Sequence, residues 1–362
     1  MKLNPYIKPK FSSAFFVMLD VIIALLPLVV ISWVAFGMKA IFVTAISVVT
    51  CLITDVLFSS IVLKRVRLSF DVSSVITGLL LAFTISPNTP LYIVCFGAVM
   101  AIVFGKIVWG GTGKNKFNPA LVGREFMAVF FASVMTSSSI WNTKNFVNIN
   151  SSTFFSALGL ENNSTYLESM IYKTSGALGE YSAVCIALGG LYLLLRKRIS
   201  WHIPSSIFIV FILLSWIISY EGDVKFSISG LLLGAIYMAT DMPSSPISMK
   251  GKLFYGSMIG CVAFAFILGG ISNEYMSYSI LLLNGFSPKI NEIFKPTAWG
   301  NKTEYRSLIE NISKLILIIL VFAFAIISLY HYQMIKYVVY LYIIFTVFKF
   351  NYSFSKKINS PI

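Results

Sequence analysis

The sequence predicts an all-α polytopic membrane protein, and three observations carry this prediction. Apolar residues make up 57% of the 362 residues and charged residues only 12%, whereas soluble domains are about 45–50% apolar. Apolar runs of about 20 residues, the length that crosses roughly 30 Å of hydrocarbon, recur along the whole chain. The first run begins near Ala14 and has no small-residue cleavage site after it, which predicts a spanning helix in place of a signal peptide.

Ten predicted spans fall into two sets of five, and a final pair follows them. The first set is 14–36, 40–63, 72–85, 91–109 and 119–135, and the second is 181–195, 203–220, 227–239, 253–271 and 275–286. The final pair is 315–329 and 335–348. We therefore expect a first transmembrane repeat (1–135), an extracytoplasmic loop (136–180), a second repeat (181–286), a cytoplasmic loop (287–313) and an additional C-terminal hairpin and tail (314–362).

Two of these spans are short and resemble each other. ITGLLLAFTISPNTP at 76–90 matches ISGLLLGAIYMATDMPSSP at 228–246, and each ends in a proline-bearing linker. Short, interrupted helices are tolerated in a bilayer only where protein surrounds them. Five crossings separate the two segments, so they run in opposite directions, which indicates an inverted repeat with short broken helices and a substrate path at the repeat interface. The alternative is that Gly-Leu-Leu strings recur by chance.

The positive charges predict the orientation of the chain. Of the 28 Lys and Arg residues, Lys106 and Arg124 lie within spans. Five others lie in or beside one set of loops, namely Lys39, Lys144, Lys173, Lys225 and Lys336. The other 21 lie in the opposite set of loops and in the termini. By the positive-inside rule both termini are therefore cytoplasmic, and the net charge of +14 is not read as a nucleic-acid signal.

Four cysteines lie in apolar segments without CxxC or Cys/His spacing: Cys51, Cys95, Cys185 and Cys261. Buried cysteine of this kind is usually apolar filler, so we expect neither a disulfide nor a metal site.

Acids inside a bilayer are expensive and are candidates for function. The candidates are Asp20, Asp55, Asp71, Glu125, Glu180 and Asp241. Glu125 directly follows Arg124, which suggests an intramembrane ion pair or network. The alternative for each acid is a helix-end carboxylate that caps a helix or reaches lipid headgroups. For Asp241 this alternative means that it caps the following turn or pairs with Lys250.

GGTGK at 110–114 lacks the spacing of a phosphate-binding loop, because Val108 occupies the first-glycine position and Asn115 follows the lysine. Its glycines suit the close approach of two backbones, or of a backbone and a planar ligand.

Four stretches resemble one family. They are GKIVWGGTGKNKFNPALVGREF at 105–126, DVSSVITGLLLAFTISPNTPLY at 71–92, GALGEYSAVCIALGGLYLLL at 176–195 and SGLLLGAIYMATDMPSSPISMKGK at 229–252. The resemblance is to the flavin-carrying membrane subunit of the Rnf and Nqr respiratory complexes, the D subunit of the former and the B subunit of the latter. It covers residues 10–295. The chain is closer in size to the Rnf subunit, while its GGTGKN…NPALVGR wording resembles the Nqr version.

The resemblance implies a cofactor, a function and partners. Such subunits hold FMN through a phosphoester to a threonine, which makes them phosphoproteins, and riboflavin is a second flavin to consider. Here Thr153 in INSSTFFSAL takes the threonine position of a pattern like VSGATPLSAL, with Asn150, Ser151 and Ser152 replacing the serine, glycine and alanine. The alternative is that NINSSTF is an ordinary polar loop.

Further site residues follow from the resemblance. It implies that Gly110, Gly111, Asn118, Arg124 and Glu180 help bind the cofactor. Asp71, Glu180 and Asp241 match family positions and Asp55 replaces a family glutamate, so the candidates for an ion pathway are Asp241, Asp55 and Asp71.

We therefore expect a translocase subunit that is inactive alone, within a six-subunit complex of the bacterial inner membrane that couples electron transport to Na⁺ or H⁺ transport. The flavin would do the redox chemistry while the protein supplies binding and electrostatics. The alternatives are a flavin-free channel or secondary transporter of the same architecture, and an assembly subunit that has lost its flavin.

Overall fold

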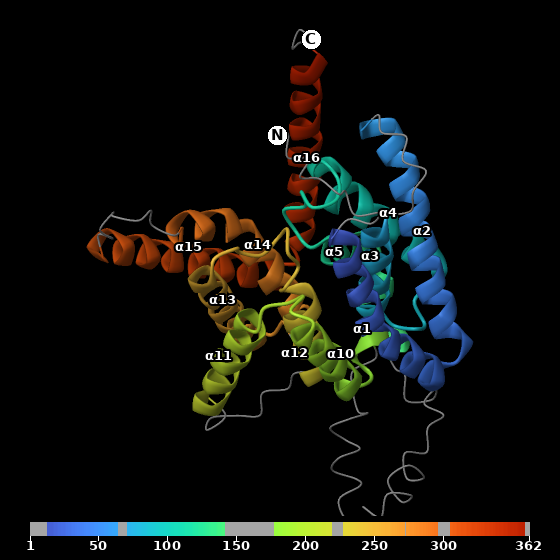
Figure 1. The fold of residues 1–362 in the computed structure, drawn as a ribbon, viewed down its shortest axis with the longest axis horizontal. Helices are drawn as coiled ribbons and strands as arrows, with labels where there is room; N and C mark the ends of the chain where they lie inside the picture. Colours follow the sequence, from blue (N-terminus) through green and yellow to red (C-terminus); the bar gives the residue numbers. More distant parts are fainter. Residues whose placement is uncertain are drawn as a thin grey trace, which may run out of the picture.

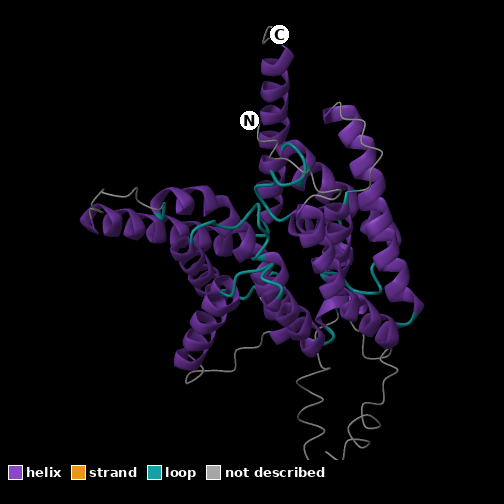
Figure 2. Ribbon diagram, in the orientation of Figure 1, coloured by secondary structure: helices purple, strands orange, loops and turns teal. Residues whose placement is uncertain are grey.

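The structure is a computed structural model that describes residues 13–63, 71–141, 177–218, 227–271, 273–295 and 305–358. These residues form helices joined by turns, and the described part of the chain contains no strand (Figures 1 and 2). The predicted all-α class is confirmed.

The described residues up to Trp141 form five main helices and three short ones. They are α1 (Ser13–Phe36), α2 (Met38–Leu63), α3 (Val72–Phe83), α4 (Leu91–Gly105), η1 (Ile107–Trp109), α5 (Pro119–Phe130), α6 (Ala132–Met135) and α7 (Ser138–Trp141). In α5, the Asn118 side chain caps the helix and Pro119 occupies its first turn, where a missing N–H costs nothing.

The second half follows with η3 (Leu178–Glu180), α10 (Ala183–Leu195), α11 (His202–Ile218), α12 (Ile228–Leu233), η4 (Gly234–Met238), α13 (Met249–Leu268) and α14 (Tyr275–Ile293). The C-terminal helices are α15 (Tyr305–His331) and α16 (Ile335–Ile358). Segment η4 is a π-helical continuation of α12, and such wide turns are frequent at functional sites.

Several helices are built to cross a membrane. Within the described ranges, five helices are long and apolar enough to span it: α1, α2, the α4–η1 segment, α13 and α15. Four shorter apolar helical segments accompany them, namely α3, α10, α11 and α12 with η4. Large apolar side chains such as Trp216 and Phe348 are exposed on the helix surfaces, as expected where lipid, and not water, surrounds a protein. The protein is a multi-pass membrane protein.

Glycines allow close helix contacts in both halves. A Cβ atom at Gly123 of α5 would lie 2.5 Å from the carbonyl oxygen of Gly97 in α4. In the second half, a Cβ atom at Gly260 of α13 would lie 2.8 Å from the carbonyl oxygen of Ile207 in α11. Small residues that bring two backbones together are typical of membrane helix interfaces.

The predicted loop 287–313 is shorter in the structure. Helix α14 continues through Ile293 and α15 already begins at Tyr305. The prediction ended each helix where apolar residues end, but lysine and glutamate are good helix formers. Lys289 and Glu292 form an ion pair of 2.8 Å on the last turns of α14.

Candidate functional site

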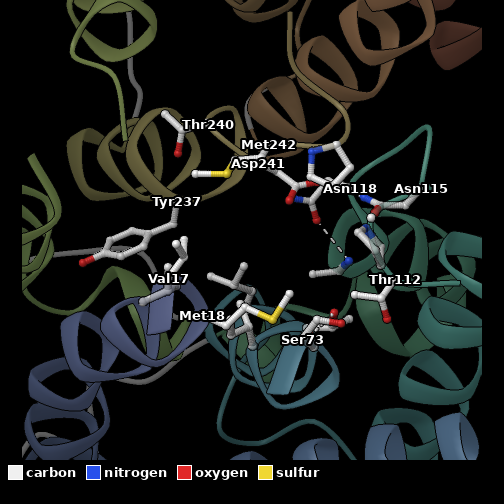
Figure 3. A pocket seen from close by; sticks show the side chains of 18 of the residues that line it. Val17, Met18, Ser73, Thr112, Asn115, Asn118, Tyr237, Thr240, Asp241 and Met242 are labelled. Carbon is white, nitrogen blue, oxygen red and sulfur yellow. Dashed lines mark hydrogen bonds between the residues drawn. The ribbon is translucent and has the colours of Figure 1, made fainter. Parts of the chain in front are cut away.

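A cavity of about 480 Å³ lies between the two halves of the chain. Its walls are α1, α3, η4 and the loop that joins η1 to α5, and Figure 3 shows side chains from these elements facing one space. The α1 and α3 walls are largely apolar, with Val17, Met18 and Leu80 among them, while the loop and the end of η4 supply polar groups. A mostly apolar cavity with a few convergent polar groups is the usual form of a ligand site.

A buried lysine gathers two of the predicted acids at this cavity. The Lys106 ammonium lies 3.0 Å from Asp71 Oδ2 and 3.4 Å from Asp55 Oδ1, and it donates to the Ser74 hydroxyl at 2.8 Å. Only 2% of Lys106 is exposed. Asp71 also caps α3, because its side chain accepts a hydrogen bond from the Ser73 N–H. The capping role that we considered as the alternative for this acid is therefore present beside the ion pair.

The third predicted acid of the pathway, Asp241, lies in the loop that follows η4. Its Oδ2 atom accepts hydrogen bonds from Asn115 Nδ2 at 3.0 Å and from the Ser244 hydroxyl at 2.9 Å. The hydrogen bond from Ser244 is the contact expected if Asp241 caps the turn that follows it, which was the alternative to a role in the ion path. Within the described residues, Asp241 forms no ion pair with Lys250.

Two asparagines of the loop before α5 join the first half to the second. Asn115 bonds to Asp241, and Asn118 Nδ2 donates to the Met238 carbonyl oxygen of η4 at 3.2 Å. The Asn118 side-chain oxygen Oδ1 accepts from the N–H groups of Ala120 and Leu121. The side chain of Asn118 therefore links η4 to the start of α5.

The GGTGK segment forms a tight turn. Gly110, Gly111 and Gly113 have φ angles of +110°, +92° and +79°, a region that glycine enters without steric cost. The turn carries Thr112 to the cavity, where its hydroxyl donates to the Asp71 carboxylate. The segment therefore reverses the backbone and positions side chains, and it does not form a phosphate-binding loop, in agreement with its spacing.

The remaining predicted cofactor residues lie in a different cluster. Arg124 in α5 pairs with Glu274, just before α14, at 2.8 Å. Glu180 in η3 accepts a hydrogen bond from the Ser227 hydroxyl at 3.0 Å. Both residues lie outside the cavity lining, so the structure separates Arg124 and Glu180 from Asn118.

The partner of Arg124 differs from the suggested one. Within the described residues, the ion pair of Arg124 is with Glu274 and not with the adjacent Glu125, which lies near both groups. Glu274 was missed by the sequence reasoning. Its signal is the short polar break SNE between two apolar runs, where an acid can reach back to a neighbouring helix.

Asp20 has a structural partnership. It lies in α1 and accepts from Arg198 Nε at 2.6 Å, Arg196 Nη2 at 3.3 Å and the Tyr192 hydroxyl at 3.0 Å. These bonds tie α1 to the end of α10 and the turn after it.

The predicted flavin-attachment residue, Thr153, lies in the segment 142–176, outside the described residues. Its role stays a prediction.

Comparison with known proteins places the chain in one protein family. Residues 1–300 match the family described as "NQR2, RnfD, RnfE family". The chain is 33% identical to the D subunit of the Na⁺-translocating ferredoxin:NAD⁺ oxidoreductase complex of Acetobacterium woodii, over 82% of this chain and 94% of that protein. It is 31% identical to the D subunit of the proton-translocating ferredoxin:NAD⁺ oxidoreductase complex of Clostridium ljungdahlii, over 79% and 92%.

A relative from the second kind of complex also matches. The B subunit of the Na⁺-translocating NADH-quinone reductase of Ectopseudomonas mendocina is 34% identical over 66% of this chain and 62% of that protein. These relatives are subunits of oxidoreductase complexes, and the C-terminal helices α15 and α16 lie beyond the family match. The chain belongs to the NQR2, RnfD, RnfE family.

Proposed function

We propose that this chain is the membrane subunit of a multi-subunit oxidoreductase complex and couples electron transfer to Na⁺ or H⁺ movement across the bacterial inner membrane. The observation that carries the proposal is the cavity between α3 and η4, which is lined by Lys106, the buried counter-ion of Asp55 and Asp71, and by Asp241. The relatives that translocate Na⁺ or protons belong to the same family.

The inverted repeat is part of this proposal, and the ends of the two short helices support it. The N-terminal end of α3, at Ser73, and the C-terminal end of η4, with Asp241 after it, line the same cavity. At the other end of α3, the Leu178 N–H donates to the Ile85 carbonyl oxygen at 2.9 Å. Glu180, two residues later, contacts the start of α12 through Ser227. These contacts support opposite directions for the two segments, as expected for an inverted repeat.

The proposed ion path uses oxygen groups at the break after η4. A carboxylate, hydroxyls and backbone carbonyl groups are the oxygen ligands that hard cations prefer. Asp241, Thr240 and Ser244 supply such groups within a few residues of each other, and Asp241 and Thr240 line the cavity. Both side-chain hydrogen bonds described for the Asp241 carboxylate are made to Oδ2. A carboxylate oxygen has more than one acceptor position, so Asp241 retains capacity for a cation.

Two flavin positions belong to the proposal. The first is FMN on Thr153, which would lie in the extracytoplasmic loop. The second is the cavity, whose volume falls in the range of about 300–1,000 Å³ that is usual for small-molecule sites. Gly110 and Gly111 form the turn beside this cavity, and Asn118 lines it while fixing η4. A bound flavin would supply the electron-transfer chemistry, and these residues would bind and orient it.

Flavin attachment at Thr153 is tested on the full chain produced together with a flavin transferase. After denaturing electrophoresis, the wild-type band should fluoresce under ultraviolet light and the Thr153→Ala band should not, because only a covalent bond survives denaturation. Thr136→Ala, at a hydroxyl in the same predicted loop, is the matched control and should keep its fluorescence. A dark wild-type band would contradict attachment.

A further inference from the structure

A second cluster of ionisable groups lies away from the cavity, where α5 meets the start of α14. Arg124 and Glu125 come from α5, and Glu274 and Tyr278 from the start of α14. The exposed fraction is 7% for Arg124 and 6% for Glu125. The cavity described above does not include any of these four residues.

The charges in this cluster do not balance. Arg124 pairs with Glu274 through Nη2 at 2.8 Å and also reaches the carbonyl oxygen of Asn273. Glu125 lies close enough to interact electrostatically with both Arg124 and Glu274, and the Tyr278 hydroxyl lies near its carboxyl group. The groups that face it are Arg124 of its own helix, Glu274 and Tyr278 of α14, and beyond these Glu180 of η3 and Tyr330 of α15. One guanidinium thus serves several carboxyl groups.

Two buried carboxyl oxygens in the cluster lack a hydrogen-bond partner among the described residues. They are Glu125 Oε1 and Glu274 Oε2, and Arg124 Nε also has no partner there. An ionised carboxylate can only accept hydrogen bonds, so two ionised glutamates would leave both oxygens unsatisfied. A buried charge without a counter-charge costs several kcal/mol, and a carboxyl group in such a place takes up a proton instead.

We infer that the α5–α14 cluster is a proton-binding site in which Glu125 carries the proton. Protonation removes the unpaired charge and converts one orphaned acceptor into a donor. Glu274 keeps the ion pair with Arg124, whose geometry is that of a charge-assisted hydrogen bond. The site is independent of the flavin and of the cation path at Asp241.

Infrared spectroscopy of the complex that contains the full-length chain tests this inference at neutral pH. The spectrum of the wild type minus that of Glu125→Gln should contain the C=O stretch of a protonated carboxylic acid, shifted downward in D₂O. Glu292→Gln is the matched control, because Glu292 is an exposed α14 glutamate paired with Lys289, and its difference spectrum should contain carboxylate stretches. Carboxylate stretches in the Glu125→Gln difference would overturn the inference.

A second variant tests the division of roles. Glu274→Gln frees Arg124 to pair with Glu125, so the carboxylic-acid band of Glu125 should be replaced by carboxylate bands. Glu125→Gln should assemble and resist heat at least as well as the wild type, because an amide is the neutral isostere of a protonated carboxyl group. Loss of assembly in Glu125→Gln alone would mean that the charge of Glu125 is needed, and it too would contradict the inference.

Discussion

At the scale of single residues, Lys106 decides the charge state of one cavity wall. It is the shared counter-ion of Asp55 and Asp71. Breaking a buried ion pair by removing one partner costs about 3–5 kcal/mol, because the remaining charge stays buried without compensation. Asp55 is 7% exposed, so it has little access to water.

We therefore predict that Lys106→Met lowers the stability of the protein by about 3–5 kcal/mol. The measurement is the midpoint of thermal unfolding in detergent, monitored with a signal that reports native assembly. Adding Asp55→Asn and Asp71→Asn to the same chain should restore part of the loss, since the orphaned charges are removed. Lys250→Met, at an exposed lysine, is the control and should leave the midpoint unchanged. An unchanged midpoint in Lys106→Met would show that the ion pairs contribute no stability.

The sequence predicted some of these residues but not their contacts. Lys106 and Arg124 were placed within spans by the apolar residues around them, and both are buried. The partners of Lys106 come from α2 and from the start of α3, and no local pattern encodes that meeting. Glu274 escaped notice for the same reason, because it acts on a helix more than a hundred residues away in the sequence.

At the scale of elements, α16 holds the loop that lines the cavity. The Tyr342 hydroxyl donates to the Phe104 carbonyl oxygen at 2.9 Å and accepts from Trp109 Nε1 at 3.1 Å. The Lys349 ammonium lies 3.5 Å from the centre of the Trp109 ring, a geometry of cation–π attraction. Helix α16 lies beyond the family match, so an added element fixes the turn at Trp109.

Tyr342→Ala should loosen this loop. Tyr342 is half-buried, so its loss costs less than the about 3–5 kcal/mol of a fully buried aromatic side chain, but it also removes two hydrogen bonds to the end of α4 and to η1. Hydrogen exchange of the backbone amides of residues 110–117 should become faster in the variant. Tyr337→Ala, at a half-exposed tyrosine of the same helix, is the matched control. Equal exchange rates in Tyr342→Ala and the wild type would mean that α16 does not restrain the loop.

Helix ends mark the limit of prediction at this scale. The apolar runs predicted where helices lie, and the proline-bearing linkers predicted where α3 and η4 stop. The continuation of α14 through Lys289 and Glu292 lacks the continuous apolar run that marks a span, and it is held by the buried Ile290 and by the Lys289–Glu292 ion pair. The role of the final hairpin was not readable from its own residues, since its contacts at Trp109 and Phe104 lie far away in the sequence.

At the scale of the whole molecule, the distribution of lysine and arginine predicts which loops face the cytoplasm. Single cysteines at Asn142 or Asn163, in a chain without other cysteines, should react with a membrane-impermeant maleimide added to intact cells. Cysteines at Ser200 or Ser248 should react only after the membrane is opened. The reverse pattern would overturn the orientation, while leaving the helical fold intact.

The central claim is that the cavity between α3 and η4 belongs to a cation path coupled to electron transfer. The direct measurement uses the purified complex in sealed vesicles, with reduced ferredoxin or NADH as the electron donor, and follows Na⁺ and proton uptake together with electron transfer. Asp241→Asn keeps the shape and hydrogen bonding of the side chain but removes its charge. We predict that it abolishes cation uptake while flavin content and assembly stay normal, and that Asp20→Asn, at the structural cross-link of α1, keeps uptake in whatever complex assembles. Unchanged uptake in Asp241→Asn would contradict the claim.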